Sequence, residues 1–213
     1  MCGRYTVRDT QAVQQEYGAV VKPSYNIAPS QDVLVVTDKK AETMKWHYSP
    51  TWAKEPMNLI NARSETLKEK PSFKMAKRCL IVADGWFEWL REGDKKQPYF
   101  FHMNSNLFTF AGIYTQYQGV KGCAVITKEA NEKLSKIHNR MPVMLKHNEG
   151  RDWLNGEDVY SSSLSEWVEY YPVSTMVNSP SNNIPECIKP LEVPSAVDDC
   201  ADVTSGYDRG QYE

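Results

Sequence analysis

The second residue of the chain is a cysteine, in the segment Met1-Cys2-Gly3-Arg4-Tyr5. Aminopeptidases remove an initiator methionine when the next side chain is small, which would leave Cys2 with a free α-amine beside its thiol. An α-amine titrates at about 7.7–8 and a thiol at about 8.5, so a useful fraction of each is reactive at neutral pH. Such a pair condenses with an aldehyde, first as a Schiff base and then as a five-membered thiazolidine. Taken alone, a small residue near a chain end also fits a position without any chemistry.

A glutamate lies among aromatic residues in the segment Gly85-Trp86-Phe87-Glu88-Trp89. On a strand, Trp86 and Glu88 would share one face, and Phe87 and Trp89 the other. Desolvation by such neighbours raises the pKa of a carboxyl group and suits it to general acid–base catalysis. An exposed glutamate on an edge strand, with its aromatic neighbours in the core, fits the sequence equally well.

Two polar residues, Asn61 and Arg63, directly follow an apolar pair, Leu59-Ile60. Because Ser64 is a candidate helix N-cap, both residues are expected at a strand-to-helix junction, where free backbone N–H groups favour phosphate. A satisfied cap with solvated neighbours explains Ser64 well and explains Asn61 and Arg63 less well.

A histidine and an arginine stand two residues apart, at His138 and Arg140, with Pro142 fixing the exit of the segment. The ordinary pKa of histidine, about 6.5, makes it a natural proton carrier. A lone histidine is more often structural than catalytic. The other histidines have no comparable context, and no HExxH motif or His/Asp cluster predicts a metal site.

The elements that must position these residues are mostly strands separated by short helices. Without a βαβ rhythm, this order predicts an α+β domain built on mainly antiparallel sheet, with short peripheral helices. The expected strands are Val33–Thr37, Thr43–Tyr48, Arg78–Asp84, Trp86–Leu90, Tyr99–Met103, Leu107–Tyr114, Cys123–Thr127 and Met141–Leu145. The expected helices are Thr10–Tyr17 behind an Asp9 cap, Ser64–Glu69, Glu129–Lys136, Arg151–Leu154 and Ser163–Tyr170.

Charge divides the chain into two parts. Residues 195–213 hold five acidic residues against Arg209, a net charge of −4, which leaves +2 on residues 1–194 because the whole chain carries −2. We therefore expect one domain over 1–194 and an acidic, loosely ordered tail over 195–213. A body so close to neutral implies that any polyanion site is a local patch.

The motifs together resemble one family. They are MCGRY at the N-terminus, YNIAPSQ at Tyr25–Gln31, INAR-E at Ile60–Glu65, GWFEW at Gly85–Trp89, HNRMPV at His138–Val143, PVSTMVN at Pro172–Asn178 and PEC-I-P at Pro185–Pro190. In this order, over roughly residues 2–191, they are similar to the SRAP (SOS response-associated peptidase) family, whose members shield abasic sites in single-stranded DNA.

The resemblance implies a covalent crosslinking enzyme, lyase-like and with possible autocatalytic removal of Met1. Mature Cys2 would trap the open-chain aldehyde of the abasic sugar as a thiazolidine. Asn61 would orient Cys2 and the opened sugar. Glu88 would shuttle protons, and His138 would hydrogen-bond the sugar and share in the proton transfers. No cofactor and no metal are implied.

The resemblance also implies DNA contacts. Arg4, Arg63 and Arg140 would clasp the flanking phosphates, a task that suits the planar guanidinium. Trp52 and Pro29 resemble the apolar wedge that breaks base stacking at the lesion, while Trp46 fits the core as well as the wedge. Two positions depart from the family's pattern: His47 stands where glycine is usual, and Asn139 where an acidic residue is common.

Two other functions remain open at this point. An N-terminal-nucleophile peptidase would use the same Cys2 with its α-amine as base, but it has no need of phosphate-suited arginines. A plain single-strand-binding module leaves Cys2, Glu88 and His138 unexplained. Five widely spaced cysteines, no signal pattern and no long apolar run lead us to expect a cytoplasmic protein, nucleoid-associated if bacterial, without a membrane partner. We expect a monomer, although these features do not determine the oligomeric state.

Overall fold

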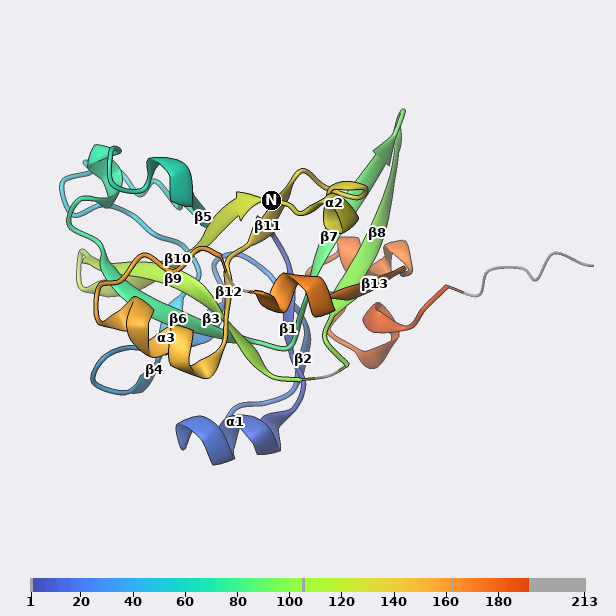
Figure 1. Ribbon diagram of the computed structural model, residues 1–213, viewed down its shortest axis with the longest axis horizontal. Helices are drawn as coiled ribbons and strands as arrows, with labels where there is room; N and C mark the ends of the chain where they lie inside the picture. The colour runs from blue at the N-terminus through green and yellow to red at the C-terminus, as the bar shows by residue number, and fades with distance from the viewer. Residues whose placement is uncertain (1, 105, 162, 192–213) are drawn as a thin grey trace, which may run out of the picture.

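Two β-sheets make up most of the computed structural model, which describes residues 2–104, 106–161 and 163–191 (Figure 1). The first sheet has five strands in the order β13-β8-β7-β1-β2, and all its pairings are antiparallel. Its strands are β1 (Tyr5–Val7), β2 (Ser24–Ile27), β7 (Gly85–Glu92), β8 (Lys95–His102) and β13 (Glu169–Pro172). The strand that follows Cys2 is therefore held on both sides, by β2 and by β7.

The second sheet has the order β11-β10-β4-β3-β6-β9-β12, with β5 added beside β10. Because β10 also pairs with β9, the strands β10, β4, β3, β6 and β9 close into a barrel. The strands are β3 (Asp32–Val36), β4 (Ala41–Lys45), β5 (Asn61–Arg63), β6 (Lys77–Ala83), β9 (Phe108–Tyr117), β10 (Val120–Glu129), β11 (Arg140–Pro142) and β12 (Met144–Leu145). The pairings of β10 with β4 and with β5 are parallel, and the others are antiparallel.

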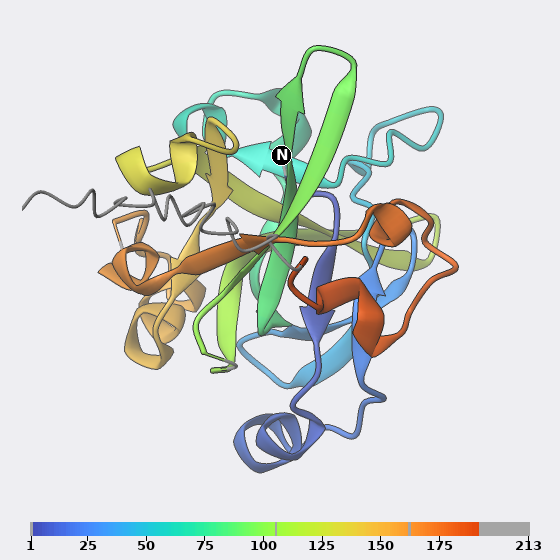
Figure 2. The same cartoon turned by 90° about the vertical axis from the view of Figure 1, so that its right-hand side faces the viewer.

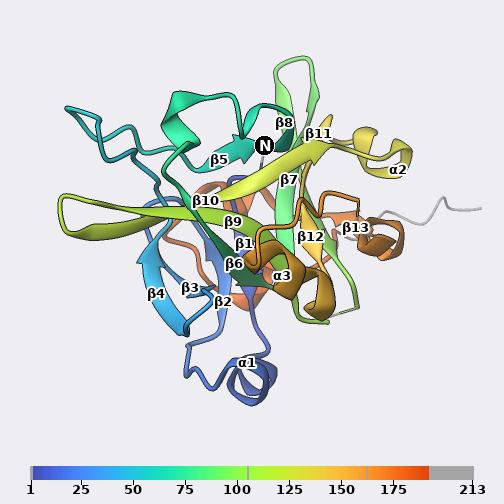
Figure 3. The ribbon, with the colours of Figure 1, turned by 60° about the vertical axis from the view of Figure 1, so that its left-hand side comes forward.

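Short helices lie around the sheets. The α-helices are α1 (Thr10–Tyr17), α2 (Glu132–Ser135) and α3 (His147–Leu154). Single 3₁₀ turns are η1 (Ser64–Thr66), η2 (Pro71–Phe73), η3 (Ser163–Trp167), η4 (Thr175–Asn178) and η5 (Pro185–Ile188). Asp9 caps α1 by accepting a hydrogen bond from the backbone N–H of Ala12 at 2.9 Å, and Gly18 ends it at φ +65°. In all three ribbon views α1 lies at the opposite end of the molecule from the tip of the β7–β8 hairpin (Figures 1, 2 and 3).

The core between the sheets is aromatic. Tyr5 of β1 packs edge-on against Trp46 and Phe110, with ring centroids 5.1 and 5.9 Å away, and Trp86 of β7 packs against the same Phe110. Burial of each large ring contributes roughly 4–6 kcal/mol at about 25 cal/mol per Å². Trp46 is fully buried, and its indole N–H donates to the carbonyl of Ile60 at 3.0 Å, so it belongs to the core and not to a wedge.

The predicted α+β class, with a mainly antiparallel sheet and short peripheral helices, is confirmed. One predicted helix is wrong in its second half, because Ser163–Tyr170 is a 3₁₀ turn only to Trp167 and Glu169–Pro172 is strand β13. Tyr170 and Tyr171 pair with Phe101 and Phe100 of β8, and these aromatic contacts across the strands outweigh the local helical pattern. The predicted tail, residues 195–213, lies outside the described residues. Across the described ranges, no helix is long and apolar enough to cross a bilayer.

Candidate active site

Cys2 leads directly into β1 and is completely buried. Pairing of Tyr5 with Trp86 and of Thr6 with Gly85 fixes this segment against β7, and the N–H of Phe87 donates to the carbonyl of Arg4 at 3.0 Å. Burial raises the pKa of the Cys2 thiol well above its ordinary value, and the neighbouring Glu88 carboxylate raises it further. The resting form of the thiol is therefore protonated, and a reaction through sulfur needs a base close by.

Asn61 holds Cys2 from the other sheet. It opens β5, where it pairs with Val125 of β10, and its side-chain Nδ2 donates to the carbonyl oxygen of Cys2 at 2.9 Å. The other side-chain atom, Oδ1, is buried and accepts no hydrogen bond from the residues that the structure describes. Asn61 thus fixes the backbone of Cys2 and keeps one acceptor for a further ligand.

Glu88 is buried, with 2% of its surface exposed, although it carries a carboxylate. Its neighbours on β7, Phe87 and Trp89, and the stacked pair Trp86 and Phe101 surround this part of the strand with aromatic rings. Burial raises the pKa of Glu88 to about 7. The desolvation of Glu88 predicted from the sequence is confirmed, and the exposed edge-strand alternative is wrong, while the acid–base role of Glu88 stays a prediction. At neutral pH the residue populates both its acid and its base form.

His138 follows α2 and is half-buried. Its Nδ1 is engaged by the backbone of Arg140: it lies 3.0 Å from the N–H nitrogen, which donates to it, and 3.3 Å from the carbonyl oxygen. Burial lowers the pKa of His138 below its usual range, and nearby cations that include Arg91 lower it further. The imidazole is accordingly neutral near pH 7, with an N–H to donate.

A cavity of about 420 Å³ brings part of this group together. Among the described residues, seven line it: Arg4, Glu88, Trp89, Arg91, Lys96, His138 and Asn178. Asn178 was not predicted as a site residue. Its carbonyl accepts from the Arg4 guanidinium at 3.2 Å, and its side-chain oxygen accepts from the indole N–H of Trp89 at 2.7 Å. The only sequence signal for this role was its place at the end of the PVSTMVN motif.

The three arginines predicted to bind phosphate differ in the hydrogen bonds that they already make within the protein. Arg4 lines the cavity, and its Nε is buried without a hydrogen-bond partner in the described part of the chain. Arg63 is exposed at the end of β5. Arg140 instead forms a fork on Glu65, with distances of 2.6 and 2.9 Å, and donates to the carbonyl of Thr127 at 2.7 Å. These hydrogen bonds from Arg140 lower the pKa of Glu65 to about 2.

The two predicted wedge residues lie outside the cavity lining. Trp52 is 57% exposed, and its indole N–H makes a long contact of 3.4 Å with the carbonyl of Pro71. Pro29 is partly buried in the turn between β2 and β3, directly before Ser30, whose φ is +71°. A large exposed indole on a loop is a surface suited to stacking against a base.

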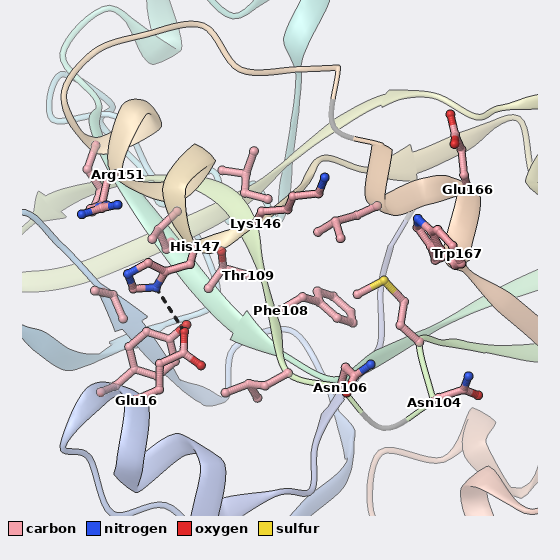
Figure 4. A pocket seen from close by; sticks show the side chains of 18 of the residues that line it. Glu16, Asn104, Asn106, Phe108, Thr109, Lys146, His147, Arg151, Glu166 and Trp167 are labelled. Atoms are coloured by element: carbon pink, nitrogen blue, oxygen red, sulfur yellow. Dashed lines mark ion pairs between the residues drawn. The ribbon is translucent and has the colours of Figure 1, made fainter.

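A larger cavity, about 960 Å³, is elsewhere, between α1, α3 and the start of β9 (Figure 4). Figure 4 shows His147 of α3 pointing toward Glu16 of α1, and their side chains are 3.4 Å apart. Lys146, Arg151 and Trp167 lie around its rim. None of Cys2, Asn61, Glu88 and His138 lines this cavity, whereas Glu88 and His138 line the smaller one. No three potential metal ligands gather in the described part of the chain.

Fold and site together place the second residue of the chain, Cys2, between the two sheets, beside a buried carboxyl group. The family described as SOS response associated peptidase (SRAP) matches residues 1–180, and the chain belongs to this family. The abasic site processing protein YoqW of Bacillus subtilis is 37% identical over 222 residues, covering 89% of this chain and 99% of its own. The protein YedK of Escherichia coli, described in the same words, is 30% identical and covers 90% and 100%.

A vertebrate relative and a solved structure extend the comparison. The abasic site processing protein HMCES of Gallus gallus is 32% identical over 226 residues, covering 81% of this chain and 67% of its own. A crystal structure of a protein from Bacteroides thetaiotaomicron superposes with a TM-score of 0.69 at 24% identity, covering 87% of this chain and 92% of that one. At this identity the likeness supports the fold alone.

Proposed function

We propose that this protein processes abasic sites in single-stranded DNA by forming a covalent crosslink through Cys2. The observation that carries the proposal is the grouping of Cys2, Asn61 and Glu88, with a carboxyl pKa of about 7 beside a buried thiol. The relatives named abasic site processing proteins support the same class of substrate.

The reaction that fits these groups is a condensation. Removal of Met1 exposes the amine of Cys2, whose nitrogen bonds to C1′ of the open-chain abasic sugar, and the aldehyde oxygen leaves as water. The thiol sulfur then adds to the same carbon of the C=N bond, and its proton passes to the nitrogen. Atoms balance as aldehyde plus aminothiol giving thiazolidine plus water, with no oxidant or cofactor required.

Each neighbouring residue has a task in this sequence. The acid form of Glu88 protonates the departing oxygen, and its base form accepts the thiol proton, which a group with a pKa of about 7 can do in turn. His138 donates its Nε2–H to the opened sugar, since Nδ1 is occupied by Arg140. Asn61 holds the backbone of Cys2 and offers Oδ1 to the amine.

The position of Cys2 favours a single strand. Because Cys2 is buried behind the cavity, the lesion must leave its stack to reach the amine, and this transition is least unfavourable in an unpaired strand. Arg4 and Arg63 are the proposed phosphate ligands, and the exposed Trp52 with Pro29 is the proposed wedge. We assign Arg140 mainly to the support of His138 and Glu65, since its head group is engaged within the protein.

A peptidase acting on other proteins is less well supported. Because Cys2 has no exposed surface, an extended peptide from another protein cannot reach it. Removal of Met1 does not require such access, since Met1 is adjacent to Cys2 in the chain. Autocatalytic removal of Met1 by the same Cys2 and Glu88 is therefore the part of the peptidase reading that we retain.

The test is incubation with a single-stranded oligonucleotide that carries one abasic site, followed by a denaturing gel and mass spectrometry. We expect a shifted band with a mass equal to protein without Met1 plus DNA minus one water. A matched oligonucleotide with a tetrahydrofuran abasic analogue, which has no aldehyde, should give no band. A band of equal intensity with the analogue, or no band with either substrate, would exclude the mechanism.

A further inference from the structure

Two cations face each other across the β7–β8 hairpin beside the cavity. Arg91 and Lys96 are directly opposite residues of the antiparallel pair, and both line the cavity together with Glu88 and His138. Both side chains are exposed, and within the described residues neither makes a hydrogen bond or an ion pair with the rest of the protein. The hairpin therefore presents two uncompensated positive charges at the mouth of the site.

This arrangement is unfavourable for the hairpin itself. Like charges directly opposite on one face of an antiparallel pair are destabilising, whereas opposite charges are stabilising. The next pair along the same strands, Glu92 and Lys95, has opposite charges and lies on the other face. Repulsion is thus confined to the pair Arg91 and Lys96, both of which line the cavity, where a bound anion would relieve it.

The hairpin and Arg63 lie on different sides of the start of the chain. Asn61 of β5, the strand that ends at Arg63, holds the carbonyl of Cys2, while β7 of the hairpin pairs with β1. The guanidinium of Arg4 donates to the carbonyls of Gly3 and Asn178, at 3.1 and 3.2 Å. A strand that crosses the cavity from the β5 side would leave it over Arg91 and Lys96.

We propose that Arg91 and Lys96 form a phosphate-binding site for the DNA backbone on one side of the lesion. This inference rests on the proposed function, since it assigns the anion to the same single strand that reaches Cys2. The guanidinium fork of Arg91 can grip two phosphate oxygens, and Lys96 adds a point charge from the opposite strand. The site is independent of base sequence, because it reads only the backbone.

The expected effect follows from counterion release. Each phosphate contact on a single strand contributes about 0.7 to the log–log salt dependence, so losing two lowers the slope by roughly 1.4. If a variant without the two contacts matches the wild type in affinity at 1 M salt, the same relation makes it roughly 25-fold weaker than the wild type at 0.1 M salt. The effect should therefore be large at low salt and vanish at high salt.

The experiment compares the full chain with Arg91→Gln/Lys96→Gln and with a control, Lys39→Gln/Lys95→Gln, that also removes two exposed positive charges. Affinity for fluorescent single-stranded DNA is measured from 0.05 to 1 M salt by anisotropy, and crosslinking by denaturing gel. Three abasic oligonucleotides are used: one with flanks on both sides, one without the 5′ flank and one without the 3′ flank.

We expect Arg91→Gln/Lys96→Gln to bind more weakly with the smaller slope, and to match the wild type on whichever oligonucleotide lacks the contacted flank. Its melting temperature should not fall, since the repelling pair is gone. A defect no greater than that of the control, or one that persists on both truncated oligonucleotides, would overturn the proposal. Failure of the proposed function is a separate result, because it appears as absence of the crosslinked band in the wild type itself.

Discussion

The substitution Glu88→Gln tests the most unusual electrostatic feature of the site, a carboxyl group that is buried beside Cys2. The amide keeps the size of the side chain and removes its titration. Burial moves the pKa of Glu88 from an ordinary value near 4.5 to about 7, which corresponds to roughly 3 kcal/mol at about 1.4 kcal/mol per unit. This is a large part of the stability of a typical domain.

The sign of the effect on stability follows from proton linkage. Below pH 4.5 the carboxyl is protonated in the folded and the unfolded chain, so its raised pKa has no effect on the free energy of unfolding. As the pH rises toward 7, the unfolded chain releases its proton first, and the wild type loses stability until the folded carboxyl also ionises. The Glu88→Gln variant does not undergo this loss, so its advantage over the wild type should grow by roughly 2–3 kcal/mol between pH 5 and pH 8.

The assay is urea unfolding of both proteins at the two pH values, followed by tryptophan fluorescence. Glu92→Gln on the same hairpin is the control, since Glu92 is exposed and its removal should not make the difference pH-dependent. Single-turnover crosslinking by Glu88→Gln should be slower by roughly 10²–10⁴-fold, and preformed crosslinks should persist longer, because the same proton carrier serves both directions. If Glu88→Gln is more stable than the wild type by the same amount at pH 5 and pH 8, the raised pKa of Glu88 is refuted. If its rates of crosslink formation and reversal equal those of the wild type, the catalytic role of Glu88 is refuted.

Three further predictions concern other parts of the structure. Cys2→Ala, Cys2→Ser and an uncleavable N-terminal tag should each abolish the stable crosslink on a denaturing gel, because the ring needs both the amine and the thiol; a tagged protein that reacts at the wild-type rate would contradict this. Arg63→Ala should lower the slope of log affinity for DNA against log salt concentration by about 0.7 in an anisotropy titration. Arg140→Ala should mainly lower the free energy of unfolding, by roughly 1–3 kcal/mol, because Glu65 and the Thr127 carbonyl lose their hydrogen-bond partner. Gly85→Ala should destabilise the fold by at least about 1–3 kcal/mol in thermal unfolding, because its Cβ would stand 2.4 Å from the Phe100 ring and 2.9 Å from the Phe101 carbonyl; a wild-type melting temperature would show that β7 and β8 can separate there.

Elements of the fold could be predicted from the sequence where the signal comes from neighbouring residues and is repeated along the chain. Helix α1 follows from its Asp9 cap, and the long strands β6 to β10 follow from extended apolar runs. The burial of Glu88 could also be predicted, because three aromatic neighbours on the same strand leave little water around a carboxylate. These features depend on residues within a few positions of one another.

The short strands were missed because three or four residues give no periodicity. Strands β1 and β5 have three residues each, and β2 and β13 have four. Each exists because of a partner far along the chain, as when Tyr5 pairs with Trp86. The fork of Arg140 on Glu65 spans 75 residues, and no pattern near Arg140 distinguishes an internal partner from a phosphate. The link from Arg4 to Asn178 spans 174 residues and was missed for the same reason.

The placement of β1 has a consequence for biosynthesis. Cys2 and β1 leave the ribosome first, yet Asn61 lies 59 residues from Cys2, and the buried hydrogen bond between Thr6 and Asp84 spans 78. His138 and Asn178 emerge later still. Contacts of such wide sequence separation form slowly, because the intervening loop must close before any of them stabilises the chain. During translation the N-terminal thiol therefore meets solvent without Glu88, Asn61 or the cavity, and the proposed crosslinking site is assembled only when nearly the whole domain has been synthesised.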